Sequence, residues 1–531
     1  MTEHVKTFAR RHPLLRDAAL WAIPAVILGA VLRWLLLSYQ PYAYWGTDSS
    51  SYFTFVDRLL THGEFELKEK RRYVYPLYLL GVGILPGATL KWLAWLQHAF
   101  GLLTLLPLAY VVRKSFVHWR WIVLPTTLLY ASLPMIIWFE HELLGENLFH
   151  AAFVWGMAGW AAWTSQSAIP RARLLWWWFF AAYTVILLIK PSGRFIVPGL
   201  ILGLLAVRAS RTLSWVQLTP LAAVVAVAMT MGTDKQSSWL LYSSSFPLTR
   251  LETPRHAEYK AEVRDLVTDL RTRLGSYFLL ADEGPKTFLK YPEKHPDRPL
   301  WAALGEDDDK RARIYRDLAL EGILARPDLF LFISAQKLVH SARLSEFKMD
   351  RFDGDYFARR FEDGYNELAE ERPQILWRLF ALPKNQPPPR YHEMAPQLGQ
   401  IGTKEEKQLV NYLTRVQQGF TLVNKRPEGF GQEWAIAAYR PAVLGWLFLV
   451  GALLALLPAY RSTVGVWVVI AFGYLFGVFL VGSANPRFFA AAWPPIILAM
   501  AVPFDLVLRA ISRAFKKRSH VATHPAVTPA A

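Results

Sequence analysis

The sequence predicts an all-α membrane protein: a polytopic bundle of about ten transmembrane helices with a large, mainly helical insertion outside the membrane. Three observations support this fold class. The chain of 531 residues is 53% hydrophobic, more than an ordinary soluble domain of this length carries. Its charged residues, 19% of the chain, gather in polar segments between long apolar stretches. Its 22 Trp and 22 Tyr residues suit the aromatic belts at the two membrane surfaces.

The long apolar stretches define the predicted spans, since a spanning helix needs about 20 mostly apolar residues. They cover residues 18–39, 89–112, 119–138, 143–163, 174–189, 195–207, 213–231, 441–460, 463–481 and 488–508. A shorter stretch, 75–85, is bracketed by prolines, and we expect it to form a helix in the outer membrane interface. No small-residue cleavage site follows the first stretch, which predicts a retained first helix.

The placement of charge predicts the orientation of this bundle. Lysine and arginine outnumber acidic residues by 59 to 42, a net charge of +17, and the basic turns fall on one side of the membrane. They contain Arg10, Arg11, Arg16, Arg113, Lys114, Arg171, Arg173, Arg208, Arg211, Arg461, Arg513, Lys516, Lys517 and Arg518. By the positive-inside rule this side is cytoplasmic. Both termini are therefore expected in the cytoplasm. We assume a bacterial inner membrane, although the same pattern fits an endoplasmic reticulum membrane, and expect no nucleic acid as partner.

Four regions follow from these spans. Residues 1–231 form an N-terminal transmembrane bundle that includes a first outer loop, 40–87. Residues 232–440 form an extracytoplasmic loop domain, 441–511 the C-terminal transmembrane helices, and 512–531 a basic cytoplasmic tail with a disordered end. Within the loop domain, Pro327 separates two helical patterns, 308–325 and 329–344.

Acidic residues at the outer ends of the spans are the first candidates for chemistry. Asp48 follows the first span and could act as a general base towards a hydroxyl nucleophile, or could cap a helix that begins at Ser49. His141, Glu142 and Glu146 lie where the third span leaves the membrane. Glu142 and Glu146 are four residues apart, so we expect them to share a helix face and one of them to face Asp48. Stabilisation of a helix N-terminus is the alternative role for either glutamate.

Basic residues on the outer face run against the positive-inside bias and are candidates for binding a lipid phosphate. They are Arg71, Arg72, Lys190, Arg194 and Arg487. Arginine presents a planar fork to phosphate oxygens and keeps its charge beside lipid. Snorkelling to lipid headgroups is the alternative for each, and it is the expectation for Arg33 inside the first span.

Metal and nucleotide sites have weaker support in the sequence. The chain has no cysteine, which excludes thiolate metal sites and a cysteine nucleophile. The cluster Glu140, His141, Glu142, Glu146 and His150 lacks the HExxH spacing of a zinc site, and no glycine-rich phosphate loop is present. We therefore predict no metal site and no cofactor, with assistance by a divalent cation left open.

Five short motifs, taken in order along the chain, resemble the GT-C membrane glycosyltransferases. They are Asp48-x-x-x-Tyr52, Arg72-x-x-Tyr75-Pro76-Leu77, Leu96-Gln97, Gly145-Glu146-x-Leu148-Phe149, and Pro486-Arg487-Phe488-Phe489 with Pro494-Pro495. The likeness is to bacterial enzymes similar to protein O-mannosyltransferases and the lipid A aminoarabinose transferase. It covers residues 18–199 well and the last helices loosely. Two features depart from the family: Ser49 replaces the second residue of a frequent Asp-Glu pair, and the soluble domain is inserted before the last three helices rather than following them.

The resemblance implies a hexosyl- or pentosyltransferase that uses a polyprenyl-phosphate sugar donor and an extracytoplasmic glycan, lipid or protein acceptor. In such enzymes an outer-loop aspartate is the presumed base of an inverting transfer. The implied site comprises catalytic acids, donor-phosphate ligands and cavity residues: Asp48 with Glu146 or its rival Glu142, then Arg72, Lys190 and Arg487, then Tyr52, Tyr75 and His141.

A transporter or flippase of lipid-linked glycans is the alternative from a different functional class. Its signature would be inverted repeats and broken helices, with ionisable groups near the middle of the membrane. The polar candidates here gather at one interface instead, which favours chemistry there.

Overall fold

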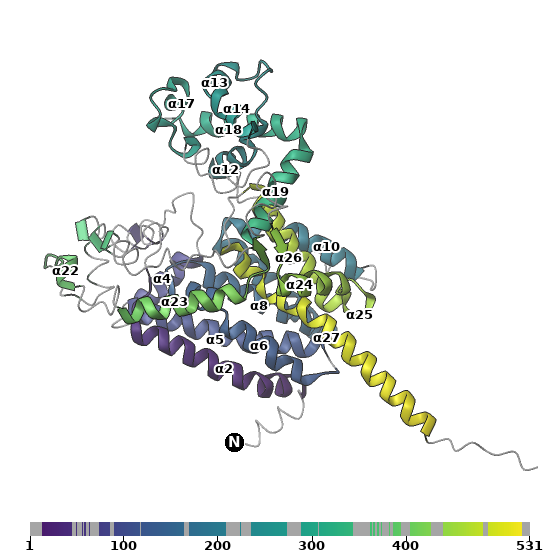
Figure 1. Ribbon diagram of the computed structural model, residues 1–531. Coiled ribbons are helices and arrows are strands. Elements are labelled where there is room, and N and C mark those ends of the chain that lie inside the picture. Colours follow the sequence, from purple (N-terminus) through teal and green to yellow (C-terminus); the bar gives the residue numbers. More distant parts are fainter. Residues whose placement is uncertain are drawn as a thin grey trace, which may run out of the picture.

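The computed structural model describes residues 13–44, 74–84, 90–116, 118–163, 169–208, 235–272, 288–305, 307–342, 391–394, 404–425, 439–481 and 487–522. It also describes residues 49, 52, 56, 58, 59, 63 and 224 and scattered positions between 362 and 390. This part of the chain is almost entirely helical (Figure 1). Its two strands, β1 (Val423–Lys425) and β2 (Tyr439–Pro441), form one short antiparallel pair.

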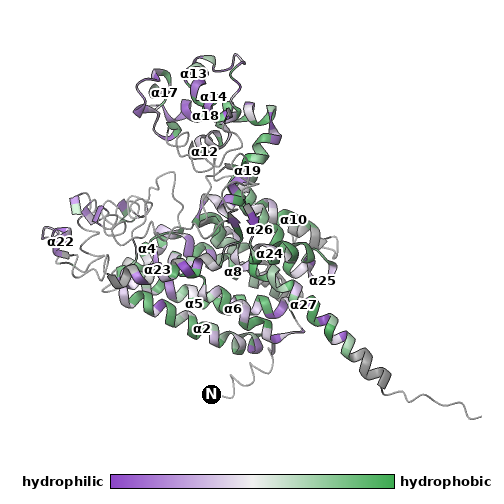
Figure 2. Ribbon diagram, in the orientation of Figure 1, coloured by the Kyte–Doolittle hydropathy of each residue, from purple (hydrophilic) through white to green (hydrophobic). Residues whose placement is uncertain are grey.

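Helices from both ends of the chain form one apolar bundle. The N-terminal group comprises α2 (Pro13–Tyr39), α4 (Val74–Ile84), α5 (Leu90–Ser115), α6 (Val123–Ser132), α7 (Pro134–His141), α8 (Glu146–Trp163), α9 (Ile169–Ile189) and α10 (Ile196–Arg208). The C-terminal group comprises α24 (Val443–Leu454), α25 (Pro458–Tyr460), α26 (Val466–Val481) and α27 (Arg487–Ala522). α10 packs along α26, and α27 contacts both α6 and α8. Figure 2 shows the apolar character of these helices.

Four helices of the described chain are long and apolar enough to cross a membrane: Pro13–Tyr39, Leu90–Ser115, Pro458–Leu480 and Phe488–Phe515. Three apolar helices are shorter: Phe180–Ile189, Ser192–Leu202 and Val443–Leu454. The predicted span 213–231 lies outside the described residues, apart from Val224. The structure thus supports a helical membrane bundle and does not confirm the predicted count of about ten spans.

The third predicted span is broken rather than continuous. Arg120–Ser132 and Pro134–His141 meet at a bend of 50° and would make a fifth span if counted together. Pro134 has no N–H to donate, and the ring of a proline disfavours a helical conformation at the residue before it. Leu133 accordingly has an extended backbone, with φ −63° and ψ 110°. As a result α7 is a short separate helix that ends at His141.

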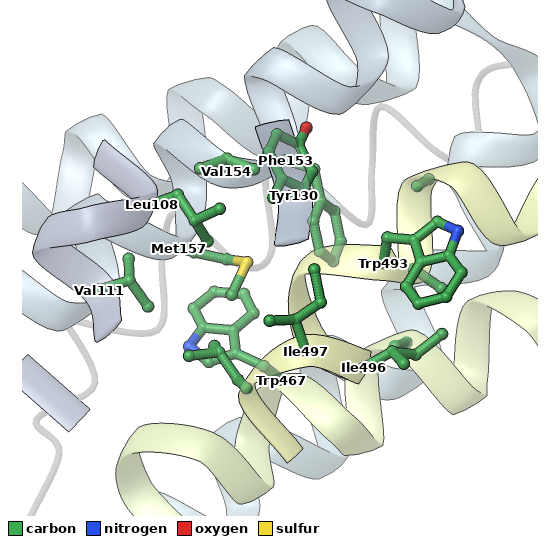
Figure 3. Close-up of a cluster of buried hydrophobic side chains, with 14 of the residues drawn as sticks. Leu108, Val111, Tyr130, Phe153, Val154, Met157, Trp467, Trp493, Ile496 and Ile497 are labelled. Carbon is green, nitrogen blue, oxygen red and sulfur yellow. The ribbon is translucent and has the colours of Figure 1, made fainter. Parts of the chain in front are cut away.

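One continuous apolar core joins the two groups of helices. Figure 3 shows Trp467 and Trp493 from the C-terminal group in the same buried cluster as Leu108, Phe153 and Met157 from the N-terminal group. The close approach of α10 to α26 depends on a glycine, because a Cβ at position 199 would lie 2.6 Å from the Cα of Ile470.

The insertion contains a second, smaller core outside the bundle. It is built by α12 (Lys235–Ser245), α13 (Ala257–Glu262), α14 (Arg264–Thr272), α17 (Pro299–Ala303) and α18 (Asp308–Ala325) around the buried rings of Tyr242, Trp301 and Tyr315. α18 has the predicted bounds because the Asp307 side chain accepts the backbone N–H of Lys310 at 2.9 Å, which caps its N-terminus. The chain divides at Pro327 as the sequence predicts, but α19 spans Pro327–Ser341 rather than the predicted 329–344.

Three helices of the insertion pack directly on the bundle, and the first, α12, lies against α26. α19 lies against α26, where the Lys337 ammonium donates to the carbonyl of Phe479 at 3.5 Å. α23 (Lys404–Gly419) lies against α7, where the Gln417 side chain accepts the backbone N–H of Met135 at 3.1 Å. The shorter elements are η1 (Arg120–Ile122), η2 (Pro191–Phe195), η3 (Phe246–Leu248), η4 (Pro292–Lys294), α22 (Tyr391–Met394) and the π-helical turn η8 (Arg461–Gly465).

The two ends of the bundle carry different polar groups. Where α2 begins and α5 ends, Asp17 pairs with Arg113 at 3.5 Å and with Arg120 at 3.8 Å. Asp505 is buried in the same half of the bundle and pairs with Arg509 at 2.8 Å. The positive-inside rule predicts that this end faces the cytoplasm. The opposite end gathers the C-termini of α2, α7 and α9 and the N-termini of α5 and α8.

Single-cysteine labelling tests this orientation, because the chain has no native cysteine. His118 and Glu258 are both exposed, the first beside the basic end and the second in the insertion. In right-side-out membrane vesicles, an impermeant maleimide should label Glu258→Cys and should label His118→Cys only after the membrane is permeabilised. Labelling of His118→Cys in sealed vesicles, with Glu258→Cys protected, would reverse the predicted topology.

Candidate active site

The candidate site is built around the turn between α7 and α8. Helix α7 ends at His141, and Glu142 has an extended backbone with φ −91° and ψ 144°. Glu146 is the first residue of α8. The prediction that Glu142 and Glu146 share one helix face is therefore wrong, because the helix that would carry both is interrupted between them. Both carboxylates are nevertheless buried at the same end of the bundle, with exposures of 9% and 3%.

The chain after α2 is hydrogen-bonded to this turn. The N–H of Tyr44 donates to the carbonyl of His141 at 2.8 Å, and the N–H of Leu143 donates to the carbonyl of Tyr44 at 2.9 Å. Tyr44 and Glu142 thereby form an isolated parallel bridge. Five residues further along, the Ser49 hydroxyl donates to the carbonyl of Leu143 at 3.0 Å. The first outer loop is therefore attached to the α7–α8 turn at two points.

Gln97 of α5 joins three segments of the site. Its amide nitrogen donates to the carbonyls of Glu140 at 2.8 Å and Glu142 at 3.0 Å. Its amide oxygen accepts the Tyr75 hydroxyl of α4 at 2.9 Å. Burial, followed by neighbouring tyrosines and glutamates, raises the pKa of Tyr75 well above its usual value, so this hydroxyl remains a donor at physiological pH. One side chain thus fixes both the turn and α4.

An ion pair is buried between α2 and α7. Arg33 donates to Glu140 from Nε and Nη2, both at 2.6 Å, and from Nη1 to the carbonyls of Gly29 at 3.0 Å and Ala131 at 3.3 Å. Arg33 is 1% exposed, as is Glu140. The expectation that Arg33 snorkels to the outer interface is therefore wrong: its guanidinium is held inside the bundle by a carboxylate and two carbonyls.

The same carboxylate begins a chain of histidines. His98 Nδ1 lies 3.0 Å from Glu140 Oε2, and His98 Nε2 lies 3.0 Å from His141 Nδ1. The His141 ring then meets the Tyr44 ring edge-on, with centroids 4.6 Å apart. The network therefore runs from the inside of the bundle to the first outer loop.

A second ion pair joins α8 to the chain after α9. The Lys190 ammonium donates to Glu146, and the side chains are 15% and 4% exposed. The Arg194 guanidinium lies nearby in η2 and covers the Phe195 ring at 5.1 Å. The predicted acid Glu146 and the predicted phosphate ligand Lys190 are thus direct partners.

The remaining predicted residues divide into two groups. Tyr52 is buried, and its ring meets that of Tyr75 edge-on with centroids 4.8 Å apart. Asp48, Arg71 and Arg72 lie outside the described residues. Arg487 is the first residue of α27, and its side chain is outside the described part. Among the described residues, no group of three or more His, Cys, Asp or Glu side chains is arranged to hold a metal ion.

Four site residues were not among the catalytic or binding residues predicted from the sequence: Arg33, Gln97, His98 and Glu140. A signal for two of them was present, because an arginine within an apolar span and a glutamate at the end of another must find partners or bear a high cost. Nothing in the sequence pairs them, since they are 107 residues apart along the chain. Gln97 belongs to the Leu96-Gln97 motif, one of the five that resemble the glycosyltransferase family, but the motif itself indicates no role for its side chain.

No protein-family model and no curated protein matches the chain. Several solved structures match it at low sequence identity. The apo oligosaccharyltransferase of Archaeoglobus fulgidus is 12% identical, with a TM-score of 0.41, over 94% of this chain and 52% of that one. ArnT from Cupriavidus metallidurans bound to undecaprenyl phosphate is 14% identical, with a TM-score of 0.32, over 91% of this chain and 78% of that one.

Both are likenesses in structure at low sequence identity. A further structure of this kind is the oligosaccharyltransferase AglB from Archaeoglobus fulgidus in complex with an inhibitory peptide and a dolichol-phosphate, 13% identical with a TM-score of 0.37. The chain spans about half the length of the archaeal enzymes. These likenesses have TM-scores below 0.5, so the proposals below rest on the residues of this chain.

The Arg33–Glu140 pair predicts a specific pattern of stability. Glu140→Gln should lower the free energy of unfolding by about 3–5 kcal/mol, because it leaves a buried guanidinium without its counter-charge. The double variant Arg33→Met/Glu140→Met should recover most of this loss, since both charges are replaced by apolar groups. Thermal unfolding in detergent measures both effects. Equal unfolding midpoints for Glu140→Gln and the wild type would contradict the pairing.

Proposed function

We propose that the protein is a glycosyltransferase that takes its sugar from a polyprenyl-phosphate donor and transfers it to an extracytoplasmic acceptor with inversion. The observation that carries this proposal is the double attachment of the first outer loop to the α7–α8 turn. Tyr44 and Ser49, which lie on either side of Asp48 in the sequence, are both hydrogen-bonded to residues 141–143. Glu146, three residues further along, pairs with Lys190. A loop with a candidate base thus adjoins a segment that carries a buried carboxylate and its partly buried cationic partner.

The proposed chemistry needs few groups. Asp48 accepts the proton of the acceptor hydroxyl as it attacks the anomeric carbon of the donor. The bond from that carbon to the phosphate oxygen breaks, and the polyprenyl phosphate departs with the bonding electron pair. Because negative charge on the phosphate grows as this bond breaks, a fixed cation attracts it more strongly in the transition state than in the ground state. We assign that cation to Lys190, assisted by Arg71, Arg72, Arg194 and Arg487.

Glu146 has a defined part in this scheme. Its carboxylate neutralises Lys190 while no phosphate is present, which reduces the cost of keeping an ammonium group among apolar helices. A bound phosphate would take over this role and release Glu146 towards Asp48 or the acceptor. Glu142, bridged to Tyr44 by backbone hydrogen bonds, is the rival for the second acidic function.

The remaining predictions complete the proposal. Residues 1–231 form the catalytic bundle, 232–440 an extracytoplasmic domain that selects the acceptor, 441–511 the C-terminal helices and 512–531 a cytoplasmic tail. The protein lies in a bacterial inner membrane with both termini in the cytoplasm and its site on the periplasmic side. Tyr52, Tyr75 and His141 line the acceptor side of the site, and their burial beside the turn is compatible with that role.

A flippase of lipid-linked glycans remains the second candidate, and two observations favour it. The α6–α7 pair is a broken helix, and Arg33 and Glu140 are ionisable groups enclosed by the bundle, as in many transporters. A flippase moves its lipid without changing it, so it needs no general base. Removal of the Asp48 carboxylate therefore separates the two functions.

The test begins by identifying the sugar. Mass spectrometry of polyprenyl-phosphate sugars and envelope glycans, with and without the protein, should reveal a lipid-linked sugar that accumulates and a glycan that loses it. Asp48→Asn should then reduce transfer about 100- to 10,000-fold, the usual contribution of a general base, while the protein accumulates normally. Asp57→Asn, in the same outer loop, is the matched control and should retain activity. If Asp48→Asn transfers sugar at the wild-type rate, Asp48 is not the general base.

A further inference from the structure

The ion pair between Arg33 and Glu140 is not explained by stability. Moving two charges out of water costs several kcal/mol for each ion, and well-packed apolar side chains are often as stable in the same place. Charged residues enclosed by membrane helices are functional candidates for this reason. Neither residue is part of the proposed catalytic scheme, so the pair requires a separate account.

The bundle is shaped to hold this pair. A Cβ at Gly101 of α5 would lie 1.9 Å from Glu140 Oε1, so only glycine leaves room for the carboxylate. A Cβ at Gly29 of α2 would lie 3.0 Å from Arg33 Nη1. Two glycines on different helices therefore accommodate the two charges.

The charge of the Glu140 carboxylate determines which ring nitrogens of His98 and His141 donate hydrogen bonds. The Glu140 carboxylate has no proton to give, so His98 Nδ1 must donate to it. In the neutral ring, His98 Nε2 is then an acceptor, and His141 must donate to it from Nδ1. The carboxylate thus sets the tautomer and the orientation of both rings, as a carboxylate does for a histidine in catalytic and metal sites.

His141 connects this network to the first outer loop through two contacts with Tyr44. Its ring packs edge-on against Tyr44, which stacks on Trp138 of α7 with centroids 4.7 Å apart. Its carbonyl accepts the N–H of Tyr44. Glu140, from the same helix turn, is held through its own carbonyl by Gln97. The loop and the turn are therefore held by one network that starts at the ion pair.

We propose that Arg33, Glu140 and His98 are positioning residues that align the first outer loop with the α7–α8 turn. This inference rests on the proposed function, in which that loop carries the base. The side-chain hydrogen bonds described for Arg33, Glu140 and His98 go to Gly29, Ala131, His141 and one another, whereas Lys190 pairs with Glu146. Loss of the network should therefore lower the rate of the transfer step and leave the affinity for a lipid phosphate unchanged.

The test compares two double variants that each remove both charges of an ion pair. Arg33→Met/Glu140→Met removes the buried pair, and Asp505→Asn/Arg509→Gln removes a partly buried pair in the opposite half of the bundle. We expect the first variant to fold and to bind undecaprenyl phosphate like the wild type, with kcat lowered about 100-fold, the effect of displacing a reacting group by about 1 Å. The control should retain kcat. Should the first variant not fold, His98→Leu breaks the network at its next member, leaves the ion pair intact, and should lower kcat similarly. A wild-type kcat in whichever of these variants folds would overturn the proposal.

A second readout does not depend on enzymatic activity. In the cysteine-free chain, Tyr44→Cys and Glu142→Cys occupy bridged positions and should form a disulfide readily. Removal of the ion pair or of His98 should lower the yield of this cross-link, and the Asp505 control should not. An unchanged yield in both network variants would overturn the positioning role. If the wild type transfers no sugar, the proposed function fails, and the cross-link alone decides whether the network aligns the loop.

Discussion

The bidentate ion pair between Arg33 and Glu140 is the interaction on which the arrangement of the candidate site depends. It joins α2 to α7 inside an apolar bundle, where a misplaced charge has no water to compensate it. The carboxylate must therefore stay within hydrogen-bonding distance of the guanidinium, which fixes the relative positions of the two helices. Gly101 and Gly29 permit this approach. The end of α7, and with it the turn to α8, follows from that constraint.

A second ion pair, between Lys190 and Glu146, gives the same end of the bundle a different property. The first pair is sealed at 2% and 1% side-chain exposure, whereas Lys190 is 15% exposed. A fully enclosed ion pair stabilises one arrangement of the helices. In a partly accessible pair, the lysine can exchange its carboxylate partner for another anion, such as a phosphate. In the proposed function this exchange is the entry of a lipid phosphate. In this account the Arg33–Glu140 pair aligns the site, and the Lys190–Glu146 pair binds the phosphate.

Much of the fold was predictable because it depends on local patterns. Long apolar runs predicted α2, α5 and the C-terminal helices, and the helical pattern before Pro327 predicted α18 and the break that follows it. The predictions were wrong where contacts between distant parts of the chain determine the backbone conformation or the partner of a side chain. Glu142 and Glu146 have helical spacing, but the pairing of Tyr44 with Glu142 draws the chain out of the helix. Arg33 seemed free to snorkel because its partner is distant in sequence, and such pairings cannot be read from spacing. Asp48, Arg71 and Arg72 remain sequence predictions.

The central claim is that the outer end of the bundle binds a lipid phosphate through Lys190. Titration of the purified protein with undecaprenyl phosphate, followed by native mass spectrometry, tests it most directly. Loss of one charged hydrogen bond corresponds to about a 10- to 100-fold change in affinity. Lys190→Met should therefore weaken binding by that factor, and Lys91→Met, an exposed lysine at the N-terminus of α5, should leave it unchanged. Equal affinity in the wild type and Lys190→Met would contradict the account.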